Sequence, residues 1–192
     1  MTTLYLIRHA ESVTNRDGIL CGITECDLSD YGFEQIAKLA DYAPNLNIDL
    51  IYTSPLRRAV KTANALNWYI NKPLIIDENL REINLGSWEG QPWTDHVSIP
   101  YKDGEDLPCV YKRITSVINK IAEENDTKTV AIVSHGCALC NFMLYVRDLP
   151  VEKYTEIGML GNTSVTKLLY SKAKKKYAVI YENETPHMGI NI

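Results

Sequence analysis

The sequence has little that would direct a protein to a membrane or to a nucleic acid. No apolar run in the 192-residue chain approaches the length of a membrane span, and its start lacks the basic flank and apolar segment of a secretory signal. Lysine plus arginine total 20 against 24 for aspartate plus glutamate, so the formal net charge is −4. The sequence therefore lacks the excess of positive charge that is typical of nucleic-acid-binding proteins. We therefore expect a cytoplasmic protein that binds neither membrane nor nucleic acid.

Patterns typical of metal sites and disulfide frameworks are also missing. The four histidines show neither an H-x-x-x-H spacing nor a C-x-x-C…H arrangement, so no metal site is indicated. The five cysteines are an odd number, which argues against a disulfide framework and favours reduced thiols. Cys137 and Cys140 have the C-x-x-C spacing of redox proteins, but that spacing is weak evidence because it is common by chance.

Apolar periodicity predicts strands that alternate with helices. Candidate strands cover residues 4–7, 50–53, 74–76, 129–133, 165–170 and 177–181. Between them lie helical patterns, two of which begin with the typical N-cap residues Ser29 and Asp106. The helix after Ser29 has an apolar stripe that we expect to be buried, namely Phe33, Ile36, Ala37 and Ala40.

The alternation of strands and helices implies βα units. We expect a single α/β domain over residues 1–192, with a mostly parallel central sheet flanked by helices on both faces. Residues 87–105 are polar and contain Pro92, Pro100 and Gly104, so we expect a short excursion from the core there.

Three of the predicted strands end in residues suited to binding an anion. The first ends at Arg8 and His9, the second at Ser54, and the fourth at Ser134 and His135. In an open α/β sheet, ligands bind beyond the carboxyl ends of the strands, where helix N-termini also attract anions. One such ending could be the polar flank of a strand. Three that meet at one edge predict an anion pocket.

A carboxylic acid completes a set of groups suited to phosphoryl transfer. Glu82 and Glu89 lie in the loop after strand 74–76, and Arg58 stands at a helix start just after Ser54. Cations can neutralise the equatorial phosphate oxygens while a nucleophile attacks in line and an acid protonates the leaving oxygen. Because no metal site is indicated, a covalent intermediate on a side chain is the natural route.

Four segments resemble, in order, the motifs of the histidine phosphatase superfamily, which includes the cofactor-dependent phosphoglycerate mutases. They are LIRHAESVTN, TSPLRRAVKTA, LREINLGSWEG and VSHG, and the segments GEDLPCVYKRI and GNTSVTKL also fall where similar segments do. The resemblance runs from Leu4 to about Leu168. It implies a phosphoglycerate mutase-like fold and an enzyme of the phosphatase branch. We expect no cofactor, and because the residues indicate no metal site we expect the enzyme to be metal-independent.

The resemblance also implies roles for six residues. His9 matches the nucleophile that becomes phosphohistidine, and Glu82 matches the proton donor. The other residues expected to contact phosphate are Arg8, Asn15, Arg58 and His135. Arg58 rather than Arg57 is the matching arginine, because the arginine of the family motif directly precedes the alanine.

The sequence departs from the family pattern at two positions. Ala10 replaces the glycine after the nucleophile, which is a small change. Cys137 stands where a second glycine often follows the Ser-His-Gly motif, so we expect a thiol at a helix start near the pocket. We expect alkylation of this thiol to lower activity moderately, with phosphate protecting it.

These observations predict a metal-independent phosphomonoesterase that acts on a small phosphorylated metabolite through phospho-His9. One alternative is a phosphoglycerate mutase-type phosphotransferase that uses the same residues, and another is a non-catalytic phosphate-binding module. The complete set of site residues disfavours the module. Residues 91–103 form a segment that is short compared with the mutases, with one lysine, Lys102, and no arginine, which disfavours the mutase. The sequence identifies neither the substrate nor the oligomeric state.

Overall fold

The described residues form a six-stranded sheet with β1 near its centre. The computed structural model describes residues 1–93 and 103–189. Its strands are β1 (Thr2–Arg8), β2 (Leu50–Thr53), β3 (Leu74–Ile76), β4 (Thr129–Ser134), β5 (Val165–Ser171) and β6 (Lys176–Glu184). They are ordered β3-β2-β4-β1-β5-β6. The pairs β2–β3, β2–β4 and β1–β4 are parallel, whereas β5 pairs antiparallel with both β1 and β6.

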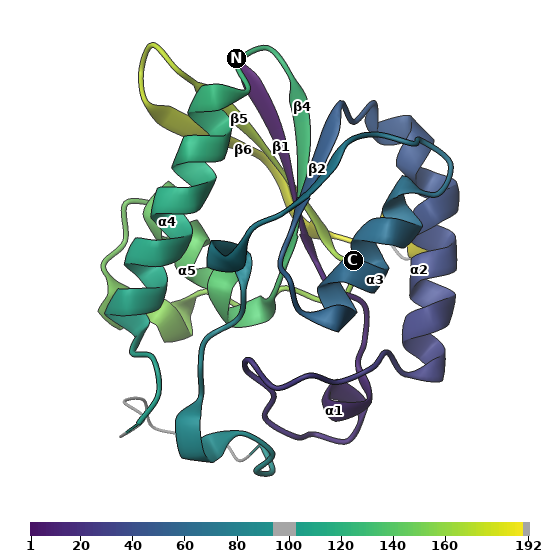
Figure 1. The fold of residues 1–192 in the computed structure, drawn as a ribbon. Helices are drawn as coiled ribbons and strands as arrows, with labels where there is room; N and C mark the ends of the chain where they lie inside the picture. The colour runs from purple at the N-terminus through teal and green to yellow at the C-terminus, as the bar shows by residue number, and fades with distance from the viewer. Residues whose placement is uncertain (94–102, 190–192) are drawn as a thin grey trace.

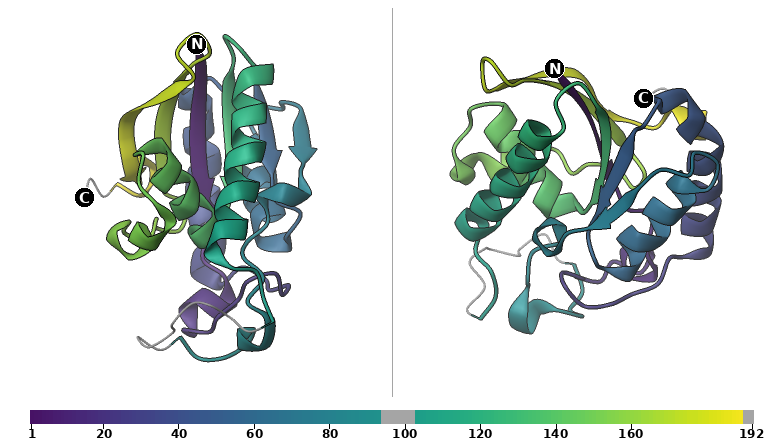
Figure 2. Two further views of the ribbon diagram at one scale, coloured as in Figure 1. Left: turned by 90° about the vertical axis from the view of Figure 1, so that its left-hand side faces the viewer. Right: turned by 45° about the horizontal axis from the view of Figure 1, so that its top comes forward.

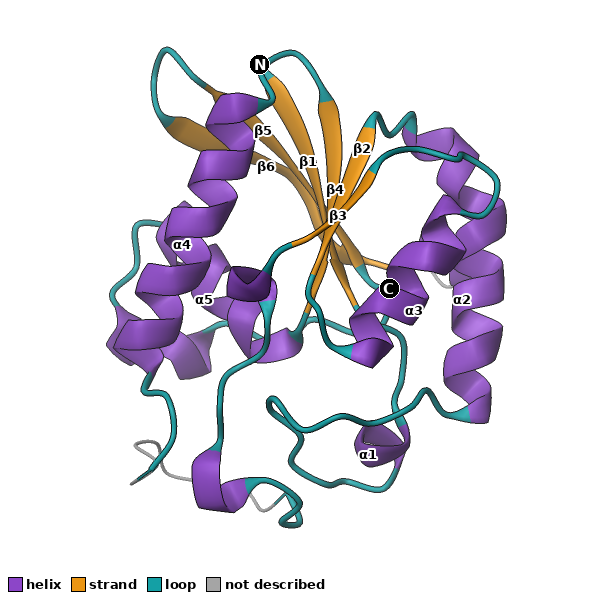
Figure 3. Ribbon diagram, viewed as in Figure 1, coloured by secondary structure: helices purple, strands orange, loops and turns teal. Residues whose placement is uncertain are grey.

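Helices cover both faces of this sheet (Figures 1 and 3). One face carries α2 (Asp30–Tyr42) and α3 (Arg57–Asn67), and the other carries α4 (Leu107–Glu124) and α5 (Gly136–Val146). The left view of Figure 2 shows α4 and α5 in front of the sheet, with the short helix α1 (Val13–Arg16) beyond the strand ends. Short 3-10 turns span Ala43–Leu46, Glu78–Leu80, Gly86–Trp88, Val151–Glu156 and Pro186–Met188. The predicted single α/β domain with a mostly parallel sheet is confirmed.

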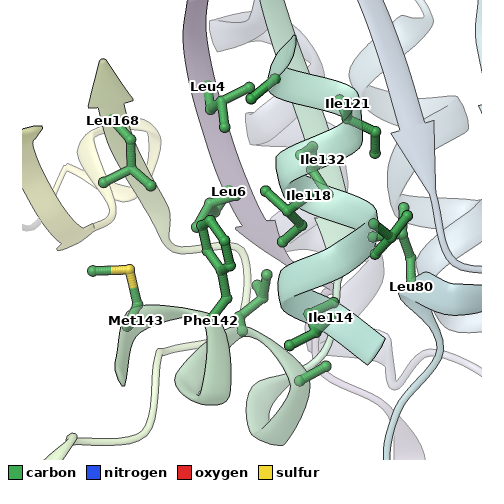
Figure 4. Close-up of a cluster of buried hydrophobic side chains, with 14 of the residues drawn as sticks. Leu4, Leu6, Leu80, Ile114, Ile118, Ile121, Ile132, Phe142, Met143 and Leu168 are labelled. Atoms are coloured by element: carbon green, nitrogen blue, oxygen red, sulfur yellow. The ribbon is translucent and has the colours of Figure 1, made fainter. Parts of the chain in front are cut away.

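The sheet separates two apolar cores because alternate residues of each strand face opposite sides. In β1, Leu4 and Leu6 belong to the core under α4 and α5, whereas Tyr5 and Ile7 belong to the core under α2 and α3. Figure 4 shows the first core, with Leu4 and Leu6 beside residues of both helices, among them Ile114, Ile118, Phe142 and Met143. Burying one large aliphatic side chain contributes about 1.5–3 kcal/mol, so these contacts hold the strand ends in place.

The predicted N-caps are confirmed, but the predicted buried stripe of α2 is wrong at two positions. The side chain of Ser29 accepts from the Gly32 amide and that of Asp106 from the Cys109 amide. Phe33 is 45% exposed and Ala37 is also exposed.

A close backbone approach explains the rotation of α2. Gly32 packs so tightly against the main chain that an added Cβ would lie 2.0 Å from the Glu11 carbonyl oxygen. The face with the glycine is therefore turned inward, and Phe33 is turned outward. Its ring lies beneath the Lys61 ammonium, 5.1 Å from the ring centroid.

The predicted excursion at 87–105 is described only at its two ends, since residues 94–102 lie outside the described part of the chain. Asp103 Oδ1 accepts from the Ser87 amide at 3.1 Å and from its hydroxyl at 3.0 Å. The Leu20 amide donates to the Gln91 carbonyl at 2.8 Å, which places the start of the segment beside the loop after α1. Within residues 1–93 and 103–189, no helix has the length and apolar character needed to cross a membrane.

Candidate active site

The residues predicted from the strand ends lie together at the carboxyl edge of the parallel strands. Arg8 at the end of β1 is in register with Ser134 at the end of β4. The next residue in each chain segment is a histidine, and the ring centroids of His9 and His135 are 5.0 Å apart. Arg58 reaches the same place from the first turn of α3, and its side chain is only 1% exposed.

One ring nitrogen of His9, Nε2, carries no proton. Its Nδ1 lies 2.7 Å from the Ala10 carbonyl oxygen, which can only accept, so Nδ1 carries the proton and Nε2 is the acceptor. Arg58 Nε donates to this Nε2 at 3.3 Å. Burial, followed by the charges of Arg58 and Arg8, lowers the pKa of His9 well below its usual value. The ring is therefore neutral at neutral pH, the form in which its Nε2 lone pair can attack.

Backbone carbonyls orient the two arginines. Arg58 Nη2 donates to the Gly22 oxygen at 2.6 Å and Nη1 to the Thr24 oxygen at 3.1 Å. Arg8 Nη1 donates to the Leu160 oxygen at 2.5 Å. Burial lowers the pKa of Arg8, and the negative charge of Glu82 opposes this effect. Backbone carbonyls thus fix one side of each guanidinium without neutralising its charge.

His135 is held by Ser54 and is also neutral. Its Nε2 lies 2.7 Å from Ser54 Oγ, which accepts from the Leu56 amide at 3.3 Å. The Ser54 hydroxyl hydrogen can therefore be donated to Nε2, which leaves the proton of the ring on Nδ1. Burial lowers the pKa of His135 well below its usual value, and the charge of Arg58 adds to the effect.

Two buried nitrogen atoms in this site have no hydrogen-bond partner among the described residues: Arg8 Nε and His135 Nδ1. A buried polar group without a partner costs about 1–3 kcal/mol, so native structures rarely keep one without a reason. Gly136 lies against the first of them, since an added Cβ would be 3.4 Å from Arg8 Nε and 2.6 Å from Met159 Sδ. The oxygens of a bound anion would supply the acceptors that both nitrogens lack.

Glu82 lies at the positive end of α5. Its Oε2 accepts from the Cys137 amide at 3.0 Å, and its Oε1 accepts from the Ala138 amide at 2.9 Å. His135 is the N-cap residue of the same helix. The start of α5 therefore fixes both the carboxyl group and the second histidine, and the helix dipole favours negative charge there. With an exposure of 8%, Glu82 is close to fully buried.

Asn15 is joined to the site through a residue that the sequence reasoning did not single out. Asn162 Nδ2 donates to the His9 carbonyl oxygen at 2.9 Å and to Asn15 Oδ1 at 3.2 Å. Asn15 Oδ1 also accepts from the Ser12 amide at 3.3 Å, within the capping box of α1. Asn162 falls in the segment GNTSVTKL, and the resemblance of that segment was the one signal that could have found it.

Comparison with known proteins identifies the family. The sequence profile of the family described as "Histidine phosphatase superfamily (branch 1)" matches residues 4–183 of the chain. The chain belongs to the histidine phosphatase superfamily.

Several known proteins are similar to this chain over most of its length. It is 29% identical over 202 residues to a putative phosphoserine phosphatase 2 from Hydrogenobacter thermophilus, with 97% of the chain and 98% of the relative aligned. It is 30% identical over 187 residues to a glucosyl-3-phosphoglycerate phosphatase from Mycolicibacterium vanbaalenii, with 86% and 83% aligned. The phosphoserine phosphatase from Entamoeba histolytica, solved in complex with 3-phosphoglyceric acid, superposes with a TM-score of 0.85 at 27% identity, over 98% of this chain and all of that one.

Glu89, the other acid of the family motif LREINLGSWEG, fixes a loop rather than facing the histidines. Its carboxylate oxygens accept from the amides of Gly22 and Ile23, each at 2.9 Å, and from the Leu85 amide at 3.2 Å. The loop that it fixes is the one whose carbonyls orient Arg58. In the described part of the chain, no three His, Cys, Asp or Glu side chains are grouped as a metal site requires.

Burial argues against the expected reactivity of Cys137, the departure from the family motif, and its alkylation remains a prediction. This thiol is 9% exposed, and burial raises its pKa well above the usual value, with the charge of Glu82 adding to the effect. Burial likewise raises the pKa of Cys140 to about 11. A thiol that is neither ionised nor accessible reacts poorly with alkylating agents. At Cys137, burial outweighs the lowering of the thiol pKa that a helix N-terminus would cause. The C-x-x-C pair is part of the core of α5.

Proposed function

We propose that the protein is a phosphomonoesterase that hydrolyses a small phosphorylated metabolite through a phosphohistidine intermediate on His9. The observation that carries this proposal is the pair of unpartnered buried nitrogens, Arg8 Nε and His135 Nδ1, beside the unprotonated Nε2 of His9. Together they form a place for a tetrahedral anion next to a neutral nucleophile. The names of the relatives, phosphoserine phosphatase and glucosyl-3-phosphoglycerate phosphatase, support the same class of reaction.

In the proposed reaction, the phosphoryl group moves from the substrate oxygen to His9 and then to water. His9 Nε2 attacks phosphorus, and the bond from phosphorus to the ester oxygen breaks. Arg8 and Arg58 neutralise the charge on the equatorial oxygens, and His135 Nδ1–H donates to one of them. The Glu82 carboxylate takes up the proton of the substrate's monoanionic phosphate, gives it to the leaving oxygen, and then takes one from the water that attacks phosphohistidine. Inorganic phosphate leaves, and His9 returns to its neutral form.

The compartment and the identity of the substrate belong to the same proposal. The five cysteines are all free thiols, which supports an enzyme of the reducing cytoplasm.

A panel of phosphorylated metabolites that includes phosphoserine, 3-phosphoglycerate and sugar phosphates, with inorganic phosphate as the readout, would identify the substrate. Release of phosphate from none of them, and none from p-nitrophenyl phosphate, would favour the non-catalytic module.

Hydrolysis of p-nitrophenyl phosphate should continue in excess EDTA. Arg8 and Arg58 supply the positive charge that a divalent ion would otherwise bring to the phosphoryl oxygens. Vanadate should inhibit, because its five-coordinate form imitates the transferring phosphoryl group. Initial rates with and without each reagent measure both effects. Activity that is lost on chelation and restored by a divalent ion would contradict the proposed site.

We expect hydrolysis rather than mutase chemistry with 3-phosphoglycerate. A mutase must shield phosphohistidine from water and grip the far end of its substrate, which calls for a closing lid with basic groups. Residues 91–103 contain one lysine, Lys102, and no arginine, although positions 94–102 lie outside the described residues. Phosphate release and 2-phosphoglycerate formation can be followed together by ³¹P NMR. Efficient interconversion primed by 2,3-bisphosphoglycerate would favour the mutase instead.

A further inference from the structure

Two cysteines outside the family motifs lie in contact beside the candidate active site. The Sγ atoms of Cys21 and Cys26 are 3.3 Å apart in the loop between α1 and α2, and each side chain is half-buried. The Cys21 thiol has two acceptors in reach of its one hydrogen, the Thr24 carbonyl oxygen at 3.1 Å and the Cys26 sulfur at 3.3 Å, and the Cys26 sulfur also accepts from Thr14 Oγ1 at 3.4 Å. Because a carbonyl oxygen can only accept, Cys21 keeps its proton as a donor, whereas Cys26 is an acceptor.

The same contacts favour the thiolate form of Cys26. The hydrogen bond from Cys21 lowers the pKa of Cys26 to about 5, and although burial opposes this, the charge of Arg58 assists it. The pKa of Cys21 is raised by the same hydrogen bond and by burial. Arg58 Nη1 lies 3.6 Å from the Cys26 sulfur and 3.7 Å from the Cys21 sulfur, which disfavours a metal cation and favours a thiolate. A half-exposed thiolate with a second thiol in contact is the arrangement found in redox-active cysteine pairs.

We propose that Cys21 and Cys26 form a redox pair that low-molecular-weight disulfides oxidise, and that the resulting disulfide inactivates the site through Arg58. The Cys26 thiolate attacks one sulfur of the small disulfide, forms a mixed disulfide and releases one small thiolate. Cys21 then loses its proton to solvent and attacks Cys26 Sγ, which forms the Cys21–Cys26 bond and releases the second small thiolate. The protein loses two hydrogens overall, and one small disulfide is reduced to two thiols.

The loop between the two cysteines transmits the change to Arg58. A disulfide bond is about 2.05 Å long, so the two sulfur atoms must approach by more than 1 Å from their present 3.3 Å. Between them in the chain lie Gly22 and Thr24, whose carbonyl oxygens hold the Arg58 guanidinium so that its Nε faces His9. A displacement of about 1 Å in a group that positions substrate can cost about 10²-fold in rate.

The test compares the protein equilibrated with oxidised glutathione and with dithiothreitol. We expect the oxidised protein to lose two hydrogens in intact mass and to give a peptide that links Cys21 to Cys26. Its kcat/KM for p-nitrophenyl phosphate should fall about 10²-fold and return with dithiothreitol. Absence of the linked peptide, or a linked peptide with unchanged activity, would overturn the proposal.

Two variants sharpen the result. Cys109→Ser removes an exposed thiol in the first turn of α4, and this variant should respond to oxidation as the parent protein does. Cys21→Ser removes the resolving thiol, so Cys26 should stop at a mixed disulfide with glutathione. The activity readout rests on the proposed function, whereas the mass readout does not. A chain that forms this disulfide yet hydrolyses no ester would refute the phosphatase proposal and keep the redox pair.

Discussion

His9→Ala is expected to reduce turnover by on the order of 10⁴- to 10⁶-fold, because the covalent route loses the group that attacks phosphorus. The His9 imidazole is neutral, and its acceptor nitrogen Nε2 receives the Arg58 Nε–H. The alanine variant keeps the backbone contacts of this position, since the His9 carbonyl accepts from Asn162 and its amide donates to the Ser134 carbonyl. The fold should therefore survive the substitution.

The measurement has two parts. Steady-state hydrolysis of p-nitrophenyl phosphate gives the loss of activity, and circular dichroism with thermal unfolding checks that the variant is folded. In the parent protein, mass spectrometry after a quench without acid should find phosphate on His9. Near-normal activity in the variant, or phosphate on a serine or aspartate instead, would remove His9 from its proposed role.

Glu82→Gln is expected to slow esters with poor leaving groups far more than it slows p-nitrophenyl phosphate. General acid catalysis contributes about 10²- to 10⁴-fold, and the p-nitrophenolate leaving group needs little of it. The parent and variant should therefore differ by that factor on an alkyl phosphate such as phosphoserine and much less on the aryl ester. The ratio of kcat values on the two substrates is the readout, since a general weakening of the fold would lower both.

Glu89→Gln is the matched control for this experiment. It makes the same chemical change in a carboxylate that binds loop amides, so it should lower stability or affinity without separating the two classes of ester. In Glu82→Gln, one oxygen that accepts from the amides of Cys137 and Ala138 becomes a donor, which is why thermal unfolding must be recorded as well. An equal loss on both esters in Glu82→Gln would assign the acid role to a group other than Glu82.

The convergence of Arg8, His9 and His135 at one edge of the sheet could be predicted from the sequence because it depends on the parallel direction of the strands. Apolar runs mark the strands, alternation with helices makes them parallel, and parallel strands end at one edge. The two N-caps were predictable for a similar reason, since the hydrogen bond of an N-cap lies within four residues of it.

Contacts made by the backbone could not be predicted in this way. Every residue has a carbonyl, so nothing in the residue types indicates that Leu160 orients Arg8 or that Gly22 orients Arg58. The contact of Asn162 with His9 depends on the antiparallel pairing of β5 with β1, which brings the loop before β5 to the end of β1. The orientation of α2 was missed because a close approach of one glycine outweighed the burial of one phenyl ring.

The cysteine pair was missed for a different physical reason. Cys21 and Cys26 are five residues apart in a loop, where no period of helix or strand relates their side chains. Their contact follows from the fold of that loop, which Glu89 fixes by accepting from the amides of Gly22 and Ile23. The C-x-x-C spacing in the sequence instead marks Cys137 and Cys140, two thiols that are buried in α5.

The position of β1 in the sheet has a consequence for biosynthesis. Its neighbours β4 and β5 begin at residues 129 and 165, so both are made long after β1 itself. At translation rates of about 5–20 residues per second, β4 and β5 are synthesised on the order of 10 s after β1. The apolar side chains of β1 have no neighbouring strands during that time. Pairings between such distant segments also close slowly. The strand that leads into His9 is thus synthesised first but can pair only after both of its neighbours have been synthesised. The pocket therefore cannot form on a nascent chain until β5 has left the ribosome.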